Sequence, residues 1–249
     1  MRILISPAKK MRVDTDSFAA PSLPAFLPET ERLLTALRAM TPAQLQKLWK
    51  CNDSIAALNQ ARLETMDLHR QLTPAILSYE GIQYQYMAPV VFDRQALDYV
   101  SAHLRILSGF YGVLRPFDGI TPYRLEMAAP LSVDGAKDLY AFWGDKLARA
   151  LAAETDLVVN LASKEYSKAV LPHLPAHVHV LTCTFGELKG NKVVEKGTMC
   201  KMARGEMVRG RAEHDVQQAE ALQAFDRLGY RFSPAHTRAE HYVYLKEDV

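Results

Sequence analysis

The apolar residues of this chain fall into short continuous runs and into helical repeats, which together predict an α+β fold. Residues 2–5 form an apolar run that ends at Ser6-Pro7, as a short buried strand does. Leucines at helical spacing predict helices over 29–40, 42–50 and 54–66, packed on a sheet. Thr41-Pro42 and Gln44 form a capping box that should begin the second of these helices.

The second half of the chain repeats both patterns. Residues 178–188 and 192–196 read as two strands joined across Lys189-Gly190-Asn191, a credible hairpin turn. Further strands are predicted over 123–127, 156–163 and 241–245, and further helices over 137–153, from Lys164 onward and over 215–228. Tyr84 and Tyr86 would share one face if 79–88 is a strand, either to stack on a base or as a packing pair.

The stretch from Leu104 to Met127 combines glycines, prolines, arginines and large apolar residues. A helix capped by Asp93 is expected to run to Leu107, and Gly109 and Gly112 then permit a tight turn with free backbone N–H groups. Arg105 and Arg115 flank this turn, so guanidinium groups and amides could converge on phosphate oxygens. The alternative is a glycine cap and a plain loop with solvated arginines.

The sequence from Leu107 to Gly112 also resembles the hairpin of a helix-hairpin-helix motif. It carries one extra residue and lacks the usual proline, and Pro116 limits the second helix. The fold class predicted is therefore a single α+β domain over residues 1–249, a mixed sheet packed with helices and containing a helix-hairpin-helix-like element.

The amino-acid composition limits the kinds of partner that the protein can bind. Of the 249 residues 49% are hydrophobic and 23% charged, and the net charge is only +2, so nucleic-acid binding needs a local basic surface. Residues 196–211 supply the densest basic segment. On a helix Lys201, Arg204 and Arg211 fall close to one stripe, and Arg209 is a further candidate contact. A solvated helix face is the competing interpretation.

Cysteine and histidine usage indicates neither a disulfide scaffold nor a metal centre. The three cysteines are far apart in the sequence, which is consistent with a protein of the reducing cytosol. His177 and His179 would share a strand face, but no third ligand is positioned, so neither metal nor cofactor is expected. No signal peptide is recognised and no apolar stretch approaches the roughly 18 residues of a membrane span, so a cytoplasmic protein is expected.

Polar residues follow two of the predicted strands. Lys9 lies just beyond the first strand, and Asn160 and Ser163 lie at the end of the strand that precedes the helix from Lys164. Ligands often bind at such strand ends. The competing interpretations are an exposed loop lysine and a serine that caps the helix.

Several segments together resemble the YaaA family of peroxide-stress resistance proteins. They occur in the family's order and cover nearly the whole chain: Ile5-Ser-Pro-Ala-Lys9, 104–116, Pro122-Tyr-Arg-Leu-Glu-Met127, 137–145, Asn160-Leu-Ala-Ser163 with Glu165-Tyr166, and Lys201-Met-Ala-Arg-Gly205. The resemblance implies a cytosolic protein that binds double-stranded DNA and limits damage by unincorporated iron and peroxide. Some members have Gly-Asp-Val-Tyr where this chain has Gly81-Ile82-Gln83-Tyr84, so any role of that aspartate does not carry over.

Two classes of function follow. The first is a DNA-binding stress protein that holds the duplex backbone with little sequence preference, through Arg105, Gly109, Gly112, Arg115, Lys201, Arg204 and Arg209. The second is an enzyme or binding protein for a small anionic ligand, with a polar pocket formed from Ser6, Lys9, Tyr123, Arg124, Glu126, Lys137, Asp145, Asn160, Ser163, Tyr166 and Lys168. Whether a reaction is catalysed stays open, as does a purely structural or adaptor role.

Overall fold

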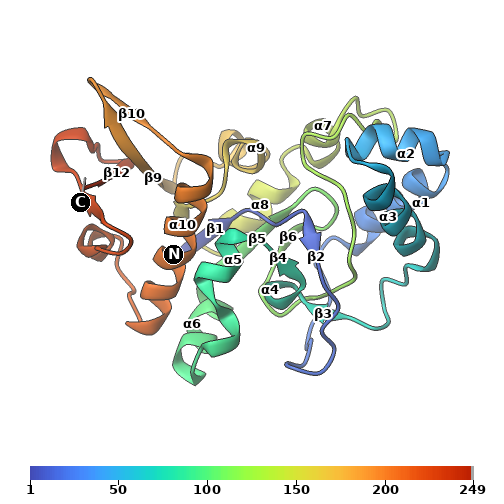
Figure 1. The fold of residues 1–249 in the computed structure, drawn as a ribbon, viewed down its shortest axis with the longest axis horizontal. Helices are drawn as coiled ribbons and strands as arrows, with labels where there is room; N and C mark the ends of the chain where they lie inside the picture. The colour runs from blue at the N-terminus through green and yellow to red at the C-terminus, as the bar shows by residue number, and fades with distance from the viewer. Residues whose placement is uncertain (248–249) are drawn as a thin grey trace.

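A mostly parallel sheet forms the centre of the molecule (Figure 1). The computed structural model describes residues 1–247. The strands lie in the order β11-β12-β9-β8-β1-β5-β6, with β10 paired to β9. Their bounds are β1 (Arg2–Ile5), β5 (Leu104–Ser108), β6 (Gly112–Leu114), β8 (Leu157–Asn160), β9 (His179–Lys189), β10 (Lys192–Val194), β11 (Tyr230–Phe232) and β12 (His241–Lys246).

Strand β1 lies in the middle because its side chains are apolar on both faces. It runs parallel to β5 on one side and to β8 on the other, with Ile3 opposite Leu104 and Val159. Ile3, Leu4 and Ile5 are fully buried, as expected for a parallel strand covered on both faces. The prediction of a short buried strand at the N-terminus is confirmed.

Ten α-helices and four short 3₁₀ helices complete the described part of the chain, residues 1–247. The α-helices are α1 (Leu27–Arg38), α2 (Pro42–Trp49), α3 (Asp53–Thr65), α4 (Ala75–Ser78), α5 (Ile82–Met87), α6 (Arg94–His103), α7 (Leu139–Trp143), α8 (Lys146–Ala152), α9 (Lys164–Ser167) and α10 (Gly197–Glu213). The 3₁₀ helices are η1 (Pro89–Val91), η2 (Leu171–His173), η3 (Glu220–Ala224) and η4 (Pro234–His236).

Helices α1, α2 and α3 gather at one end of the molecule, away from β11 and β12 (Figure 1). They confirm the three helices predicted from leucine spacing. The capping box is also present, since Thr41 Oγ1 accepts from the Gln44 amide while Gln44 Oε1 accepts from the Thr41 amide. Two small ladders lie between this end and the main sheet: β2 (Lys10–Met11) with β4 (Tyr79–Glu80), and β3 (Thr73–Pro74) with β7 (Gly119–Ile120).

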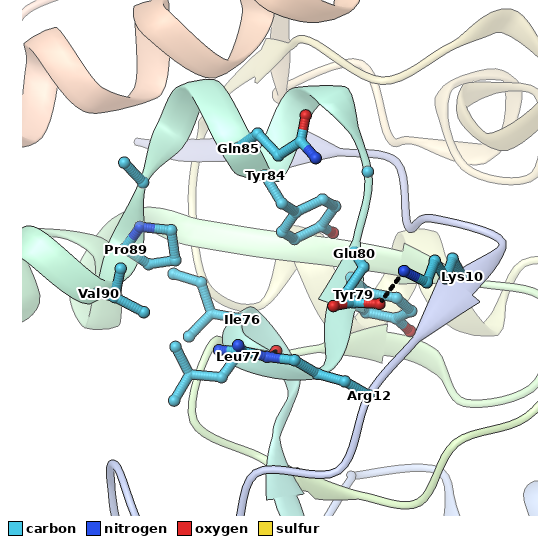
Figure 2. A pocket seen from close by; sticks show the side chains of 12 residues that line it. Lys10, Arg12, Ile76, Leu77, Tyr79, Glu80, Tyr84, Gln85, Pro89 and Val90 are labelled. Atoms are coloured by element: carbon cyan, nitrogen blue, oxygen red, sulfur yellow. Dashed lines mark hydrogen bonds and ion pairs between the residues drawn. The ribbon is translucent and has the colours of Figure 1, made fainter.

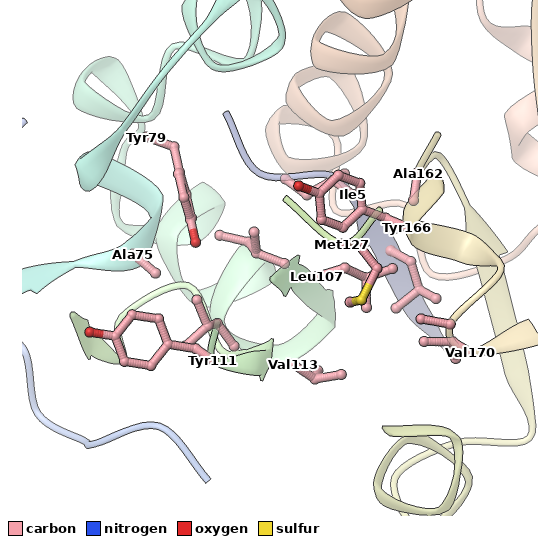
Figure 3. Close-up of a cluster of buried hydrophobic side chains, with 14 of the residues drawn as sticks. Ile5, Ala75, Tyr79, Leu107, Tyr111, Val113, Met127, Ala162, Tyr166 and Val170 are labelled. Carbon is pink, nitrogen blue, oxygen red and sulfur yellow. The ribbon is translucent and has the colours of Figure 1, made fainter. Parts of the chain in front are cut away.

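The stretch from Leu104 to Leu114 is a β-hairpin, so the predicted continuation of the helix to Leu107 is wrong. Helix α6 ends at His103, and β5 and β6 pair antiparallel, with Ser108 opposite Gly112. The apolar residues of β5 are needed on both faces of the sheet, where Leu104, Ile106 and Leu107 are fully buried. Figure 3 shows Leu107 within a buried cluster that includes Ile5, Tyr111 and Tyr166.

The expected helix-hairpin-helix-like element is therefore not what this stretch forms. Its turn has no amides to offer an anion at Phe110 and Tyr111, because both donate to Ser108 Oγ, at 3.1 and 2.8 Å. Gly112 does take the positive φ expected of it, 76°, but there it packs against Trp143 inside the protein.

Other element predictions are corrected by local geometry. Residues 79–88 are not one strand: β4 ends at Glu80 and α5 follows. Residues 123–127 have no ladder partner among residues 1–247, and Tyr123 is instead held by hydrogen bonds to Tyr79 and Ser108. The helix predicted over 137–153 is two helices, because Gly144 at φ 51° separates α7 from α8.

The C-terminal third agrees with the sequence except at one helix. The β9–β10 hairpin, the basic helix α10 and the strand β12 are confirmed. The helix predicted over 215–228 is only the 3₁₀ helix η3, because Asp215 has φ 47° and the carbonyl of Val216 accepts from the Arg211 side chain. The chain therefore turns back over α10 instead of starting a new α-helix.

Candidate functional site

The loops after β1 and β8 meet at the carboxyl end of these parallel strands. Ser163 donates its backbone N–H to Ser6 Oγ at 2.8 Å, and the Ser6 hydroxyl donates to Ser163 Oγ at 3.2 Å. Tyr84 of α5 adds a third element, since its hydroxyl donates to the Ser6 carbonyl at 3.0 Å. Parallel strands thus bring residues far apart in sequence to one edge of the sheet, where ligand sites commonly lie.

A cleft of about 510 Å³ opens at this edge. It is bordered by the loop after β1, the start of α5, the residue Glu126, the start of α9 and one face of α10. The lining residues are Ser6, Pro7, Ala8, Lys9, Lys10, Glu80, Gly81, Ile82, Gln83, Tyr84, Glu126, Ser163, Glu165, Tyr166, Lys201 and Arg204. We call this the β1–β8 cleft.

A smaller cavity of about 300 Å³ adjoins the cleft and shares Lys10, Glu80, Gly81 and Tyr84 with it. Figure 2 shows the Lys10–Glu80 ion pair, 3.0 Å long, at the edge of this cavity. Both side chains are partly or largely exposed, so the pair contributes little stability. Both hollows are therefore lined by this weakly held pair.

Glu126 is held between two cations. Its Oε2 lies 2.8 Å from Lys9 Nζ, and its Oε1 lies 3.4 Å from Arg124 Nη2. Lys9 is mostly exposed, whereas Arg124 is largely covered. Glu126 is thus a positioned carboxylate that faces the cleft.

Helix α10 contributes two cations on one face. Lys201 is exposed and makes no ion pair with any residue from 1 to 247. Arg204 is much less accessible, with a side chain 11% exposed, and donates through Nη2 to Glu195 at 3.1 Å. Its buried Nε has no hydrogen-bond partner within the described chain. The cleft therefore holds one free cation and one guanidinium with unused donor capacity.

Helix α5 adds a buried amide and a buried phenol. Gln83 is 6% exposed, and its Nε2 has no partner among residues 1–247. A buried donor without a partner costs free energy, so a ligand that accepts from it would recover that cost. Burial raises the pKa of Tyr84 and of Tyr166 well above the ordinary value, so both phenols stay protonated. The Tyr84 proton is already donated to the Ser6 carbonyl, which leaves Tyr166 as the phenol that can donate to a ligand.

The structure brings together only part of the residue set predicted for a pocket. Ser6, Lys9, Glu126, Ser163 and Tyr166 line the cleft. The remaining predicted residues do not line it: Tyr123, Arg124, Lys137, Asp145, Asn160 and Lys168.

Three of these other residues have structural partners of their own. Asn160 is buried and accepts from the Ala162 amide, which shapes the turn after β8. Asp145 pairs with Arg149 on the surface of α8, and Lys168 Nζ lies 4.8 Å from the centre of the Tyr140 ring. Their polar groups therefore have partners outside the cleft.

The Arg105 side chain is held near the start of β1, away from the cleft. It is 4% exposed, and its Nε and Nη2 contact Glu154 Oε2 at 2.8 and 2.5 Å. The same carboxylate accepts from Arg2 at the start of β1, whereas the cleft lies beyond the end of that strand. Burial lowers the pKa of Arg105, and Glu154 opposes that effect.

The other residues predicted to contact DNA are also dispersed. Gly109 packs against the backbone of Leu125, and Gly112 against Trp143. Arg115 is exposed, while Arg209 pairs with Glu213 at 2.7 Å. Of the seven predicted residues, only Lys201 and Arg204 line the cleft.

Gln83 and Glu165 are among the lining residues that were not predicted from the sequence. Glu165 Oε1 accepts from the Ala128 amide at 3.1 Å, which ties the loop after Glu126 to α9. Glu165 lies in a segment that resembles the family and Gln83 in one that departs from it, and neither has a spacing that indicates a role. Their position depends on how α5 and α9 pack around the strand ends.

Within residues 1–247, no three His, Cys, Asp or Glu side chains gather so that they could hold a metal ion. No helix in the same range has the length and apolar character needed to cross a bilayer.

Comparison with known proteins gives matches along nearly the whole chain. A family model described as "Peroxide stress protein YaaA" matches residues 1–236. A UPF0246 protein of Pediococcus pentosaceus is 51% identical over 249 residues, covering 100% of this chain and 99% of the relative. A UPF0246 protein of Agathobacter rectalis is 50% identical over 247 residues, covering 99% of each.

Proposed function

The chain belongs to the peroxide stress protein YaaA family, and on that premise we propose that it binds a small anionic ligand in the β1–β8 cleft. The observation that carries this proposal is the convergence of Ser6, Ser163 and Glu126 with the cations Lys201 and Arg204 in one hollow. Sequence positions as distant as 6 and 204 supply them. A cleft with mixed charges and unused donors is typical of a site for a small polar molecule.

Each group has a distinct part in this proposal. Lys201 and Arg204 hold the anion, and the Gln83 amide donates to a second ligand atom. Glu126, fixed between Lys9 and Arg124, is the candidate for accepting or returning a proton if the ligand is transformed. Tyr166 remains a hydrogen-bond donor for the ligand, because its raised pKa opposes ionisation at neutral pH, whereas Tyr84 holds the loop at Ser6.

Replacing Lys201 with alanine tests the anion site. Because a charge-assisted hydrogen bond would be lost, we expect the affinity for inorganic phosphate, measured by isothermal titration calorimetry, to fall by about tenfold or more. Lys192→Ala is the matched control, since Lys192 is an exposed lysine on β10 that does not line the cleft. Equal losses in both variants, or no saturable phosphate binding by the unmodified protein, would contradict the proposal.

A second candidate is the binding of double-stranded DNA, which the family resemblance implies. The specific support is that Lys201 and Arg204 lie on the same face of α10 at the mouth of the cleft. The buried Arg105 and the hairpin at 109–112 are left out of this surface. The proposed interface is therefore smaller than the one expected from sequence. It would contact about two phosphates, and this number sets the expected salt dependence of the DNA affinity.

Salt titration distinguishes this candidate. With two phosphate contacts, the affinity for duplex DNA should fall about tenfold between 50 and 200 mM salt, equally for two unrelated duplexes. Fluorescence anisotropy measures this, and Lys201→Ala should reduce the salt slope by about one. A salt-insensitive or sequence-selective complex would exclude it.

In the cell, we propose that the protein limits damage by unincorporated iron and peroxide, as the family resemblance implies. The cleft gives this role a chemical test. A strain that lacks the protein should regain survival in hydrogen peroxide with the unmodified chain and less so with Lys201→Ala. Full rescue by that variant would separate the cellular role from the cleft.

A further inference from the structure

Another cavity, of about 340 Å³, lies on the C-terminal half of α10, where the segment 214–227 folds back over the helix. Met207 and Leu222, both almost fully buried, are among its lining residues, together with Phe225. Arg211, His214 and Arg227 also line it. It shares no lining residue with the β1–β8 cleft. We call it the α10 cavity.

Arg211 is a buried cation without a carboxylate partner. It is 3% exposed, and no carboxylate from residues 1–247 lies within 4.0 Å of it. Its Nε donates to the Tyr99 hydroxyl at 3.1 Å and its Nη2 to the Val216 carbonyl at 2.7 Å. Its Nη1 is buried and has no hydrogen-bond partner within the described residues. Such a group is costly unless an anion or acceptor completes its surroundings.

The acidic residues around the cavity are engaged by other arginines. Glu206 and Glu213 both pair with Arg227, at 2.9 and 2.6 Å, and Glu213 also pairs with Arg209. Asp226 lies 3.5 Å from Arg231. Arg211 is therefore the guanidinium of this cavity that has no carboxylate of its own within the described chain, and a bound anion would pair with it.

We propose that the α10 cavity binds a small organic carboxylate with an apolar body. The carboxylate pairs with the Arg211 guanidinium, while the apolar body lies against Met207, Leu222 and Phe225. A guanidinium and a carboxylate match in geometry, so they can form paired hydrogen bonds. Removing a ring or a short alkyl chain from water against the apolar wall makes the binding free energy more favourable. Fully hydrated anions such as phosphate gain nothing from that wall, so they should bind less well.

The probe is benzoate, compared with benzamide and acetate in calorimetric titrations of the whole chain. Benzamide keeps the ring without the charge, and acetate keeps the charge without the ring. We expect each to bind at least about tenfold more weakly than benzoate. Equal binding of benzamide, or no saturable binding of benzoate, overturns the proposal.

Replacing Arg211 itself risks misfolding, because it fixes the loop after α10, so the variant is made at the rim. Ala224 is exposed and lines the cavity, and Ala224→Glu places a like charge beside the carboxylate. We expect about tenfold weaker benzoate binding from Ala224→Glu and tighter binding from Ala224→Lys. Ala57→Glu, at an exposed alanine of α3 that does not line the cavity, is the matched control and should bind as the unmodified chain does.

The same titrations separate the two sites. Benzoate held in the β1–β8 cleft would respond to Lys201→Ala and not to Ala224→Glu, and that result overturns the proposal. Loss of binding in Ala224→Glu with normal binding in Lys201→Ala supports it, whatever the cleft binds.

Discussion

Replacing Gly205 with alanine is expected to destabilise the protein by about 2–3 kcal/mol, although alanine is normally the better helix former by about 1 kcal/mol. Helix α10 packs against α5 at this glycine, and a Cβ there would collide with the Gln83 carbonyl and lie 2.9 Å from the Met87 amide nitrogen. Both are backbone atoms, so α5 itself would have to move. Urea denaturation followed by circular dichroism measures the change.

Gly197→Ala is the matched control for this substitution. Gly197 belongs to the same helix, and nothing lies within 4 Å of the position that its Cβ would occupy. We expect it to be neutral or slightly stabilising. If Gly205→Ala were equally harmless, the close packing of α10 on α5 would be refuted, and with it the placement of Lys201 and Arg204 beside Gln83.

Replacing Glu154 with leucine is expected to cost about 3 kcal/mol at neutral pH. Glu154 Oε2 accepts from both Arg2 and Arg105, and Arg105 is buried, so the variant leaves a buried guanidinium without its counterion. Removing one member of a buried pair typically costs 3–5 kcal/mol, and the partial exposure of Glu154 places this case at the lower end. Glu64→Leu, at an exposed glutamate of α3 without an ion pair in the described chain, should change stability by less than about 0.5 kcal/mol.

The same variant predicts a change in acid sensitivity. Burial alone would raise the pKa of Glu154, but hydrogen bonds from Arg2 and Arg105, with their charges, outweigh it and hold the pKa below the ordinary value of 4.5. The stabilisation from this carboxylate is therefore present above about pH 4.5 and is lost as the pH falls through the lowered pKa of the folded state.

Denaturation at a series of pH values from neutral to acidic measures this effect. The difference in unfolding free energy between the unmodified protein and Glu154→Leu should shrink as the pH falls. A difference that stays constant would show that the loss arises from packing, and not from the charge of Glu154.

Helix α10 connects the features with proposed binding roles. Its N-terminal half presents Lys201 and Arg204 to the β1–β8 cleft, and its C-terminal half presents Arg211 to the α10 cavity. The basic character of this segment was visible in the sequence as one patch. In the structure these basic residues line two separate hollows. The position of each residue on α10 decides whether it faces α5 or the segment 214–227.

The sequence by itself determined the elements whose signals are local. Three such elements are present in the structure as predicted: the apolar strand β1, the capping box at Thr41 and the turn at Gly190-Asn191. In each of them, neighbouring residues alone favour one conformation. Ser6 and Ser163 could also be expected near a site, because both follow strands and the ends of neighbouring parallel strands lie together.

Only the tertiary structure decided the conformation of residues 104–114 and the partners of the charges. Leucines at 97, 104 and 107 suit a helix as well as a buried strand, and the choice depended on β1 lying beside this segment. The charge of Arg105 is neutralised by a glutamate 49 residues away, whereas Arg211 has no carboxylate within reach in the described chain. Charge pairing depends on distances of a few ångströms after folding, and residue spacing along a chain does not contain them.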